Sequence, residues 1–411
     1  MFRQAIKPTT RVFLARGYAS SATKSPNDVI IASAARTPVA CFQGGLKSLS
    51  APKLGAIAAR AAIDRAGLKP EQIEEAYIGN VIQANIGQAP ARQVVLEAGC
   101  PEATEATTIN KVCSSGMKAI IMAAQSIKLG DRDIMLAGGM ESMSNAPYYA
   151  PRNAAYGHQQ QNDSIIKDGL WDVYNQFHMG NCAENTAKVQ NISREEQDAH
   201  ALESYKRAAK AWENGVFDAE IAPVTIKSRK GEVVIKEDEE YKNVKYEKIP
   251  QLRTVFQKDG TVTAANASTL NDGASALVLM SRKKAEELGV KPLARIVSYA
   301  DAAMAPVDFP IAPSKAVPIA LKKAGLEVKD ISLFELNEAF SVVARANEKL
   351  MGLDADKVNV AGGAVALGHP IGSSGSRIVV TLTHLLKTGQ FGAAGICNGG
   401  GAASAIVIQK E

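Results

Sequence analysis

One arrangement of landmarks occurs twice in this 411-residue chain, and it constrains the fold more than any other feature. Apolar residues at helical spacing run from Gly116 to Gly130, and a second apolar run then leads into Gly138. The same landmarks return 259 residues later, at Gly375, Gly389 and Cys397. Because three landmarks share one offset, we expect two halves with the same topology, whose repeated helices meet in the core.

Both halves alternate short β-branched strands with helices, which is the βαβ pattern of an α/β fold. The expected strands are Val29–Ala32, Ala76–Ile78, Leu277–Met280, Leu293–Val297, Leu333–Glu335 and Ala405–Ile408. The sequence therefore predicts a mixed sheet covered by helices in each half. We place the N-terminal half at residues 28–146 plus 264–285, and the C-terminal half at residues 288–411.

A polar stretch, residues 147–263, interrupts the N-terminal half. Within it, Ser193 and Glu196 form a capping box that starts a helix, which we expect to end near Asn214. A disordered linker is the alternative. The two tryptophans of the stretch and its capped helix favour an inserted loop domain instead.

The first residues carry the whole excess of positive charge. The net charge is +5, and residues 1–24 hold five basic residues and no acid, which leaves 42 basic and 42 acidic residues in the rest. A leader of this composition is typical of an organelle transit peptide, placed here at residues 1–27, with a disordered basic tail as the alternative. The balanced body argues against a nucleic-acid partner. No apolar run has the length of a membrane span.

Cys113 is the first candidate for chemistry. The five cysteines contain no Cys-x-x-Cys pair, which favours free thiols over a zinc site or a redox pair. Cys113 directly precedes a predicted helix, whose N-terminus favours a thiolate, and a thiolate is a strong nucleophile. A small buried residue in a turn is the alternative. The Ser-Ser-Gly116 that follows allows close approach of the backbone and favours a functional role.

A glycine-rich segment from Gly362 to Gly375 carries the second candidate, His369. The segment holds more glycines than we expect packing alone to require. A P-loop is excluded, because His369 stands where that motif needs a lysine. Pro370 stiffens the loop and can aim the imidazole, although a structural histidine is the alternative.

Two further motifs supply Cys397 and Asn337. Cys397 precedes Asn398 and three glycines, whose N–H groups suit a developing oxyanion. Asn337, in an Asn-Glu-Ala-Phe motif, follows a predicted strand and either caps the next helix or orients a water or a substrate carbonyl. Two thiols and an imidazole fit carbon–carbon bond chemistry through an acyl-cysteine.

Together and in this order, the motifs resemble those of the thiolase family, over the whole chain from about Asp28. Asn-x-x-Cys-x-Ser-Gly, Asn-Glu-Ala-Phe, Gly-His-Pro-x-Gly-x-Ser-Gly and Cys-x-Gly-Gly-Gly are all intact. Segments 177–180 and 261–268 look most similar to the biosynthetic, short-chain branch found in mitochondria. The resemblance implies the thiolase fold, with a mixed five-stranded sheet in each half. It also implies a mitochondrial matrix location and a homotetramer assembled as a dimer of dimers.

The resemblance further implies the reversible condensation of two acetyl-CoA to acetoacetyl-CoA and coenzyme A, without an organic cofactor. Cys113 would carry the acetyl group, His369 would take the Cys113 proton, and Cys397 would remove the α-proton of the second acetyl-CoA. The N–H groups of Cys113 and Gly399 would form one oxyanion hole. His369 and a water held by Asn337 would form the other. One cysteine serves both half-reactions, so ping-pong kinetics follow.

Ligand contacts are also implied by the resemblance. Those with coenzyme A fall on Tyr205, Asn243, Val244, Lys245, Lys248 and Ser268, with His178 and Met179 beside the pantetheine arm and the acyl group. Potassium, an activator of some members, would be held by Tyr205 and by carbonyls of Ala264, Ala265, Ala267 and Val365. A tyrosine packed inside the loop domain is the alternative. Lysines 227, 230, 242, 245 and 248 either attract the nucleotide phosphates or form a solvated face.

Two other functions remain open. A degradative 3-ketoacyl-CoA thiolase would use the same side chains with a wider pocket. A non-catalytic acyl-CoA carrier is the alternative of another class, and the intact Cys113, His369 and Cys397 speak against it. The sequence leaves open whether synthesis or cleavage is the physiological direction, and whether α-methyl substrates fit.

Overall fold

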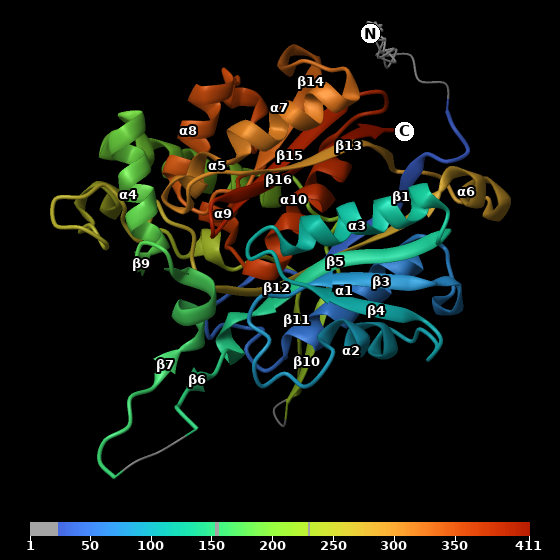
Figure 1. Ribbon diagram of the computed structural model, residues 1–411, viewed down its shortest axis with the longest axis horizontal. Helices are drawn as coiled ribbons and strands as arrows, with labels where there is room; N and C mark the ends of the chain where they lie inside the picture. Colours follow the sequence, from blue (N-terminus) through green and yellow to red (C-terminus); the bar gives the residue numbers. More distant parts are fainter. Residues whose placement is uncertain (1–23, 153–155, 229–230) are drawn as a thin grey trace, which may run out of the picture.

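A mixed sheet of ten strands forms the centre of the molecule in the computed structural model, which describes residues 24–152, 156–228 and 231–411 (Figure 1). The strands are β1 (Val29–Arg36), β2 (Ala40–Cys41), β3 (Glu75–Gly79), β4 (Glu105–Ile109), β5 (Ile134–Ser142), β12 (Asn271–Ser281), β13 (Ala294–Ala303), β14 (Ile331–Leu336), β15 (Phe391–Asn398) and β16 (Ala402–Lys410). Their order is β14-β15-β16-β13-β1-β12-β5-β3-β4, with β2 paired to β12. The α/β class with a mixed sheet, predicted from the repeat, is confirmed.

The two halves share this sheet, because β1 pairs with β13 in an antiparallel register. The N-terminal half supplies β1, β12, β5, β3 and β4, and the C-terminal half supplies β13, β16, β15 and β14. The fifth strand expected in the C-terminal half is reduced to one parallel bridge between Val358 and Phe334. Asn359 explains this, since its amide bonds to both the N–H and the C=O of Leu336 and so ends the ladder.

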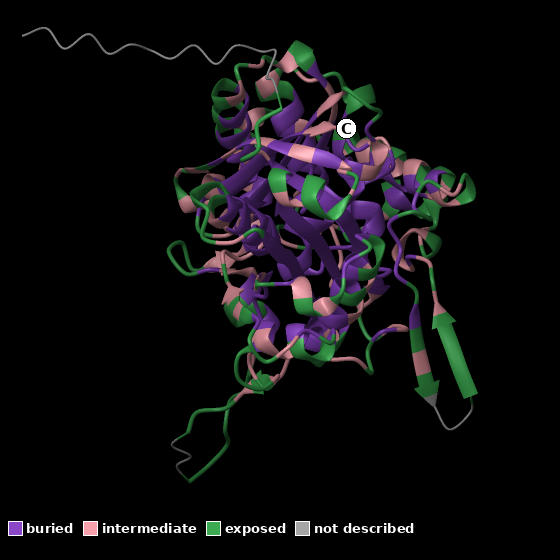
Figure 2. Cartoon of the chain, turned by 90° about the vertical axis from the view of Figure 1, so that its right-hand side faces the viewer, coloured by how far each residue is buried: buried purple, intermediate pink, exposed green. Residues whose placement is uncertain are grey.

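Helices cover the sheet in layers. The helices outside the loop segment are α1 (Ala51–Arg65), α2 (Pro90–Glu97), α3 (Ser115–Leu129), α6 (Arg282–Leu288), α7 (Pro313–Ala324), α8 (Ser341–Met351), α9 (Ala364–Leu367) and α10 (Ile371–Leu385). α1 and α2 pack on the outer face of the N-terminal half, and α7 packs on that of the C-terminal half. α3 and α10 lie between the halves. Figure 2 shows the buried residues gathered in these central layers.

The repeated helices α3 and α10 meet at their glycines, as the repeat predicted. A Cβ atom on Gly116 would lie 2.9 Å from the backbone nitrogen of Ser376. A Cβ atom on Gly375 would lie 2.7 Å from the backbone nitrogen of Met117. Distances this short exclude a side chain, so the missing Cβ atoms allow the two helices to pack closely. The N-terminal ends of both helices are thereby brought together.

Residues 147–263 contain their own helices and hairpins. The helices are α4 (Met179–Gln190) and α5 (Arg194–Glu213), and the paired strands are β6 (Tyr148–Tyr149) with β7 (Asn162–Asp163), β8 (Trp171–Asp172) with β9 (Phe177–His178), and β10 (Val224–Ser228) with β11 (Gly231–Ile235). The predicted capping box is confirmed, since Ser193 and Glu196 exchange side-chain and backbone hydrogen bonds at the start of α5. We therefore propose to treat this segment as one loop domain.

Short helical turns connect the longer elements. They are 3-10 turns at Pro70–Gln72, Met143–Asn145, Glu240–Lys242, Tyr246–Gln251, Pro306–Ile311, Val328–Asp330 and Ala355–Lys357, and a π-turn at Ile165–Leu170. Residues 1–23 of the expected leader, 1–27, lie outside the described part of the chain. Within the described part, no helix combines the length and the apolar character needed to cross a membrane.

Candidate active site

A cavity of about 670 Å³ is shared by the two halves and the loop domain. Cys113 lines it from the N-terminal half, His369 and Gly399 line it from the C-terminal half, and His178 and Met179 line it from the loop domain. Its volume is that of a site for a small organic ligand. Segments distant in sequence, each predicted to carry chemistry, are therefore brought to one cavity.

Cys113 lies in the turn between β4 and α3. The residue before it, Val112, has φ = 48°, which is uncommon for a β-branched side chain and marks a constrained turn. The hydroxyl of the next residue, Ser114, donates to the side chain of Asn398 at 2.9 Å and to the carbonyl of Ile396 at 3.2 Å. These two acceptors flank Cys397, which is completely buried near the end of β15. Ser114 therefore fixes the two cysteine segments against each other.

Both thiols are neutral at rest, which corrects the expectation of a thiolate at Cys113. Burial raises the pKa of Cys113 to about 12, against the opposing effect of the Gly399 and Cys113 N–H groups. Burial also raises the pKa of Cys397 well above its usual value, and the charge of Cys113 adds to this. Helix α3 begins at Ser115, and its N-terminus does not outweigh the loss of water around the sulfur. A nucleophilic Cys113 therefore needs a base.

His369 has the properties of that base. Its Nδ1 lies 2.5 Å from the hydroxyl of Ser374, and this hydroxyl donates to the carbonyl of Pro370 at 3.0 Å. Because the Ser374 proton is used there, Nδ1 carries the imidazole proton and Nε2 holds a lone pair. Burial, and secondarily the charge of Arg377, lower the pKa of His369 to about 4. His369 is therefore a neutral imidazole, and its Nε2 has no hydrogen-bond partner in the described part of the chain.

Two residues that hold the His369 loop were missed by sequence reasoning. Asn271 accepts the His369 N–H at 2.8 Å. Glu141 accepts the N–H of Gly372 at 3.0 Å, and burial raises the pKa of this carboxyl to about 7. Their separations from the loop are 98 and 231 residues, so no local pattern could have found them.

Packing explains the glycines of this loop, so the expectation that they exceed what packing requires is wrong. A Cβ atom on Gly372 would lie 2.5 Å from the carbonyl oxygen of Met140. Gly368 has φ = +98° and lies against the side chain of Asn271. A Cβ atom on Gly363 would lie 2.5 Å from the carboxylate of Glu338. Close contacts with other segments thus account for the glycine content.

Asn337 is not a helix cap. Helix α8 begins at Ser341, and Phe340 precedes it as the N-cap residue. The Asn337 side chain is buried, and neither its oxygen nor its nitrogen has a hydrogen-bond partner among the described residues. A buried amide in this state calls for a water or a ligand group. Asn337 itself does not line the cavity, although Ala339 and Phe340 do.

The residues expected to contact coenzyme A divide into two groups. Asn243 and Ser268 line the cavity with His178 and Met179, and the ring of His178 stacks on Phe256 at 4.7 Å. The others, Tyr205, Val244, Lys245 and Lys248, lie outside its lining. The apolar part of the lining includes Met143, Leu170, Phe256 and Ile371. Sequence reasoning missed these residues, because in the sequence an apolar residue of a pocket looks the same as an apolar residue of the core.

The described lysines of the loop domain are exposed. Lys245 and Lys248 are both solvent-exposed. Lys227 forms an ion pair with Glu232 at 3.3 Å and Lys242 forms one with Glu237 at 2.6 Å, while Lys230 lies outside the described residues. Paired, exposed lysines are typical of a solvated face.

The expected potassium ligands fall into two sets, which are the pair Tyr205 and Val365 and the carbonyls of segment 264–267. Tyr205 and Val365 pack in the same apolar cluster, and burial raises the pKa of the Tyr205 hydroxyl, which keeps it neutral. In the part of the chain that the structure describes, no hydrogen bond ends on the carbonyl oxygens of Ala264, Ala265 or Ala267. Unused carbonyls and a neutral hydroxyl are groups of the kind that suit a hard monovalent cation.

Comparison with known proteins agrees with this geometry. The model of "Thiolase, N-terminal domain" matches residues 29–283, and that of "Thiolase, C-terminal domain" matches residues 290–410. The chain is 61% identical over 398 residues to a mitochondrial acetyl-CoA acetyltransferase of Bos taurus, with 96% of this chain and 94% of the relative covered. It is 61% identical over 384 residues to an acetyl-CoA acetyltransferase of Yarrowia lipolytica, with 93% and 97% covered.

A solved structure gives the same result. The Acat5 thiolase of Ascaris suum, crystallised with coenzyme A, has a TM-score of 0.91 and 51% identity to this chain. The match covers 93% of this chain and 100% of that one. The two family models together extend over both halves and the loop domain between them. The chain belongs to the thiolase family.

Proposed function

We propose that this chain is an acetyl-CoA C-acetyltransferase, which condenses two acetyl-CoA reversibly to acetoacetyl-CoA and coenzyme A. The single observation that carries the proposal is the cavity in which a half-buried thiol, Cys113, and a neutral imidazole, His369, are exposed to the same ligand volume. Relatives about 60% identical over nearly the whole chain are named acetyl-CoA acetyltransferases, which supports it.

The first half-reaction transfers an acetyl group to Cys113. Nε2 of His369 takes the thiol proton, Sγ attacks the thioester carbon, and the departing coenzyme A thiolate receives the proton from His369. The N–H groups of Cys113 and Gly399 lie against Sγ and lower its pKa, so they are close enough to donate to the oxyanion formed there.

The second half-reaction forms the carbon–carbon bond. Cys397 gives its proton to His369 and then removes the α-proton of a second acetyl-CoA, whose carbanion attacks the acetyl-Cys113 carbonyl. The Cys113 thiolate leaves and regains its proton from His369, so protons balance over the cycle. The unpartnered amide of Asn337 suits a water that, with His369, donates to the enolate oxygen.

Coenzyme A recognition follows from the residues of the loop domain. Asn243, Ser268, His178 and Met179 would contact the pantetheine arm inside the cavity, and exposed Lys245 and Lys248 would meet the nucleotide phosphates with Tyr205 and Val244 behind them. No organic cofactor is required by this chemistry. A potassium ion on Tyr205 and the carbonyls of Ala264, Ala265, Ala267 and Val365 would stiffen the same wall and activate the enzyme.

The cellular setting is part of the proposal. Curated relatives carry the word mitochondrial in their names, and the basic N-terminus suits import to the matrix. Acetyl-CoA, acetoacetyl-CoA and coenzyme A are the proposed partners, and we propose a homotetramer built as a dimer of dimers.

Thiolysis with substrates of two lengths tests the function. Acetoacetyl-CoA and a long-chain 3-ketoacyl-CoA are compared at equal concentrations of coenzyme A, with and without potassium, for the wild type and Cys113→Ala. We expect turnover of the short substrate, its increase by potassium, and its loss in Cys113→Ala. Equal or faster turnover of the long substrate would instead identify a degradative thiolase.

A further inference from the structure

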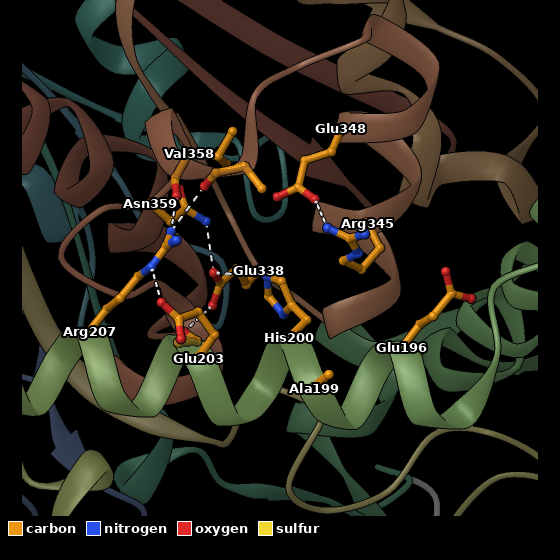
Figure 3. A pocket seen from close by; sticks show the side chains of 12 residues that line it. Glu196, Ala199, His200, Glu203, Arg207, Glu338, Arg345, Glu348, Val358 and Asn359 are labelled. Carbon is orange, nitrogen blue, oxygen red and sulfur yellow. Dashed lines mark hydrogen bonds and ion pairs between the residues drawn. The ribbon is translucent and has the colours of Figure 1, made fainter.

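A second cavity, of about 290 Å³, lies beside the segment that carries Asn337 (Figure 3). Helix α5 forms one side of it, and Glu338 lines it together with Asn359. The next two residues, Ala339 and Phe340, line the active-site cavity instead. The short segment 337–340 therefore separates the two cavities, with Asn337 and Glu338 as neighbours.

The carboxylate of Glu338 is buried and receives hydrogen bonds from three segments. Its Oε2 accepts from the hydroxyl of Ser204 at 2.7 Å and from the N–H of Val365 at 3.2 Å. Its Oε1 accepts from the side chain of Asn359 at 2.8 Å and faces Nε2 of His200 at 3.4 Å. Figure 3 shows His200 on α5 directed toward Glu338. Both carboxylate oxygens of Glu338 therefore accept hydrogen bonds.

Each of the three segments that bond to Glu338 is connected to an element of the active site. Ser204 belongs to α5 of the loop domain and also accepts the N–H of Gly363 at 3.0 Å. Val365 lies four residues before His369 in the same glycine-rich segment. Asn359 is bonded to Leu336, two residues before Glu338. One carboxylate thus holds the loop domain, the His369 segment and the Asn337 segment in a fixed relation.

Gly363 shows that this contact is tight. Its φ of −129° is extended backbone that any residue adopts, so conformation does not require glycine here. A Cβ atom at this position would lie 2.2 Å from the carboxyl carbon of Glu338. The absence of a side chain at Gly363 therefore makes room for the Glu338 carboxylate.

We propose that Glu338 is a positioning residue of the condensation, which sets Asn337 and His369 in place relative to the loop domain. The proposal rests on the function proposed above. Burial alone would raise the pKa of Glu338, but His200 and the bonds from Ser204 and Asn359 lower it overall, so the carboxylate is charged at neutral pH. The charge satisfies donors from three segments at once, which an uncharged side chain cannot do.

Glu338→Gln is the main test, because it keeps the shape of the side chain. Both oxygens of Glu338 accept from donors, so either orientation of the amide places an NH₂ group against another donor. We expect kcat for acetoacetyl-CoA thiolysis to fall about 10- to 100-fold, since small displacements of reacting groups carry costs of this order. KM should change much less than kcat.

Glu203→Gln is the matched control. Glu203 lies on α5 next to Ser204, lines the same cavity as Glu338 and forms a partly exposed ion pair with Arg207. Because exposed pairs contribute little, its kcat should stay within about twofold of the wild type. Rates are normalised to the fraction of Cys113 that iodoacetamide alkylates. A purely structural Glu338 would lower the melting temperature and leave this normalised kcat unchanged.

Ser204→Ala supplies a second, milder variant. It removes the hydroxyl that bonds to Glu338 and to Gly363, and we expect a several-fold loss of kcat. In the double variant with Glu338→Gln, the two effects should be clearly less than additive, because the side chains share one interaction. The proposal would be overturned if the losses of kcat were additive in the double variant. It would also be overturned if both single variants kept the normalised kcat of the wild type.

The outcomes separate this inference from the function on which it rests. Absence of thiolysis in the wild type would overturn the proposed function. Normal thiolysis in the wild type and in Glu338→Gln, with loss in Cys113→Ala, would overturn only the positioning role. If Glu338→Gln does not fold, Ser204→Ala alone decides, and an unchanged kcat in that variant counts against the proposal.

Discussion

The hydroxyl of Ser374 lies 2.5 Å from Nδ1 of His369 and donates its own proton to the carbonyl of Pro370. This relation fixes the tautomer of the imidazole and leaves the lone pair on Nε2, which has no partner among the described residues. A base prepared in this way is needed because burial keeps the Cys113 thiol protonated.

Ser374→Ala should slow acetyl transfer without unfolding the protein. Without the hydroxyl, both tautomers and other ring orientations become accessible, so we expect the rate of Cys113 acetylation to fall about 10- to 100-fold, within the range of general-base contributions. The burst of coenzyme A released in a single turnover measures this step. Thr383→Val on the same helix is the control, since that hydroxyl bonds, among the described residues, only to the carbonyl of Val379 and lies away from the ring. Equal bursts in the two variants would contradict the assignment.

Alkylation of Cys113 should accelerate with pH well beyond neutrality. Because its pKa is raised to about 12, the thiolate fraction and the rate with iodoacetamide should rise about tenfold per pH unit from pH 7 to pH 10. Free cysteine levels off above about pH 8.5 and serves as the reference. Subtraction of the rate in Cys113→Ala removes the contribution of other thiols. A plateau below pH 8 would show a preformed thiolate–imidazolium pair instead.

The acid limb of the pH–rate profile should lie near pH 4. The proposed mechanism needs neutral His369, and its pKa in the folded protein is lowered from 6.5 to about 4. As pH falls, the base is therefore lost on passing through about 4, and kcat/KM for the first acetyl-CoA should stay flat down to about pH 5. Stopped assays at fixed ionic strength measure the profile. A half-maximal value near pH 6.5 would show that the imidazole is solvated.

Cys397→Ala should separate the two half-reactions. In the proposed mechanism, acetyl transfer to Cys113 does not use the Cys397 thiol, whereas removal of the α-proton does. Radiolabelled acetyl-CoA should therefore label the protein about as fully as the wild type, and no acetoacetyl-CoA should form. Cys100→Ala, in the core beneath α1 and α2, is the control and should retain condensation. Loss of labelling together with condensation would rule out separate roles for the two thiols.

Gly116→Ala should destabilise the protein although alanine is the better helix former. The added Cβ atom would lie 2.5 Å from Oγ and 2.9 Å from the backbone nitrogen of Ser376, so α3 and α10 would have to separate. Overpacking of this kind costs about 1–3 kcal/mol in the free energy of unfolding, more than the gain in helix propensity. Urea unfolding measures the change. Ser126→Ala, on the same helix, is the control and should leave stability nearly unchanged.

Local sequence patterns predicted the features that depend on local chemistry. The repeated motifs at Gly116 and Gly375 indicated the paired helices, and Ser193 with Glu196 indicated the start of α5, because each motif lies within a few residues of the helix that it specifies. The motifs of Cys113 and His369 likewise led to one cavity.

Features that depend on distant contacts were not accessible in this way. The thiolate expected at Cys113 failed because burial by other segments raises its pKa, and burial cannot be read from neighbours in sequence. Asn337 was a plausible helix cap until the helix was seen to begin at Ser341. Glu141 and Asn271 support the His369 loop from elements far away in the chain. Their roles exist only after the sheet is assembled.

The short antiparallel pairing of Ile30 and Ile31 with Arg295 and Ala294 joins the two halves in one sheet. A break in the chain at residues 286–287 would leave each fragment with a bare strand edge, a known template for aggregation. It would also leave Cys113, the proposed nucleophile, in one fragment and His369, the proposed base, in the other. Neither fragment alone would therefore hold both groups of the proposed chemistry.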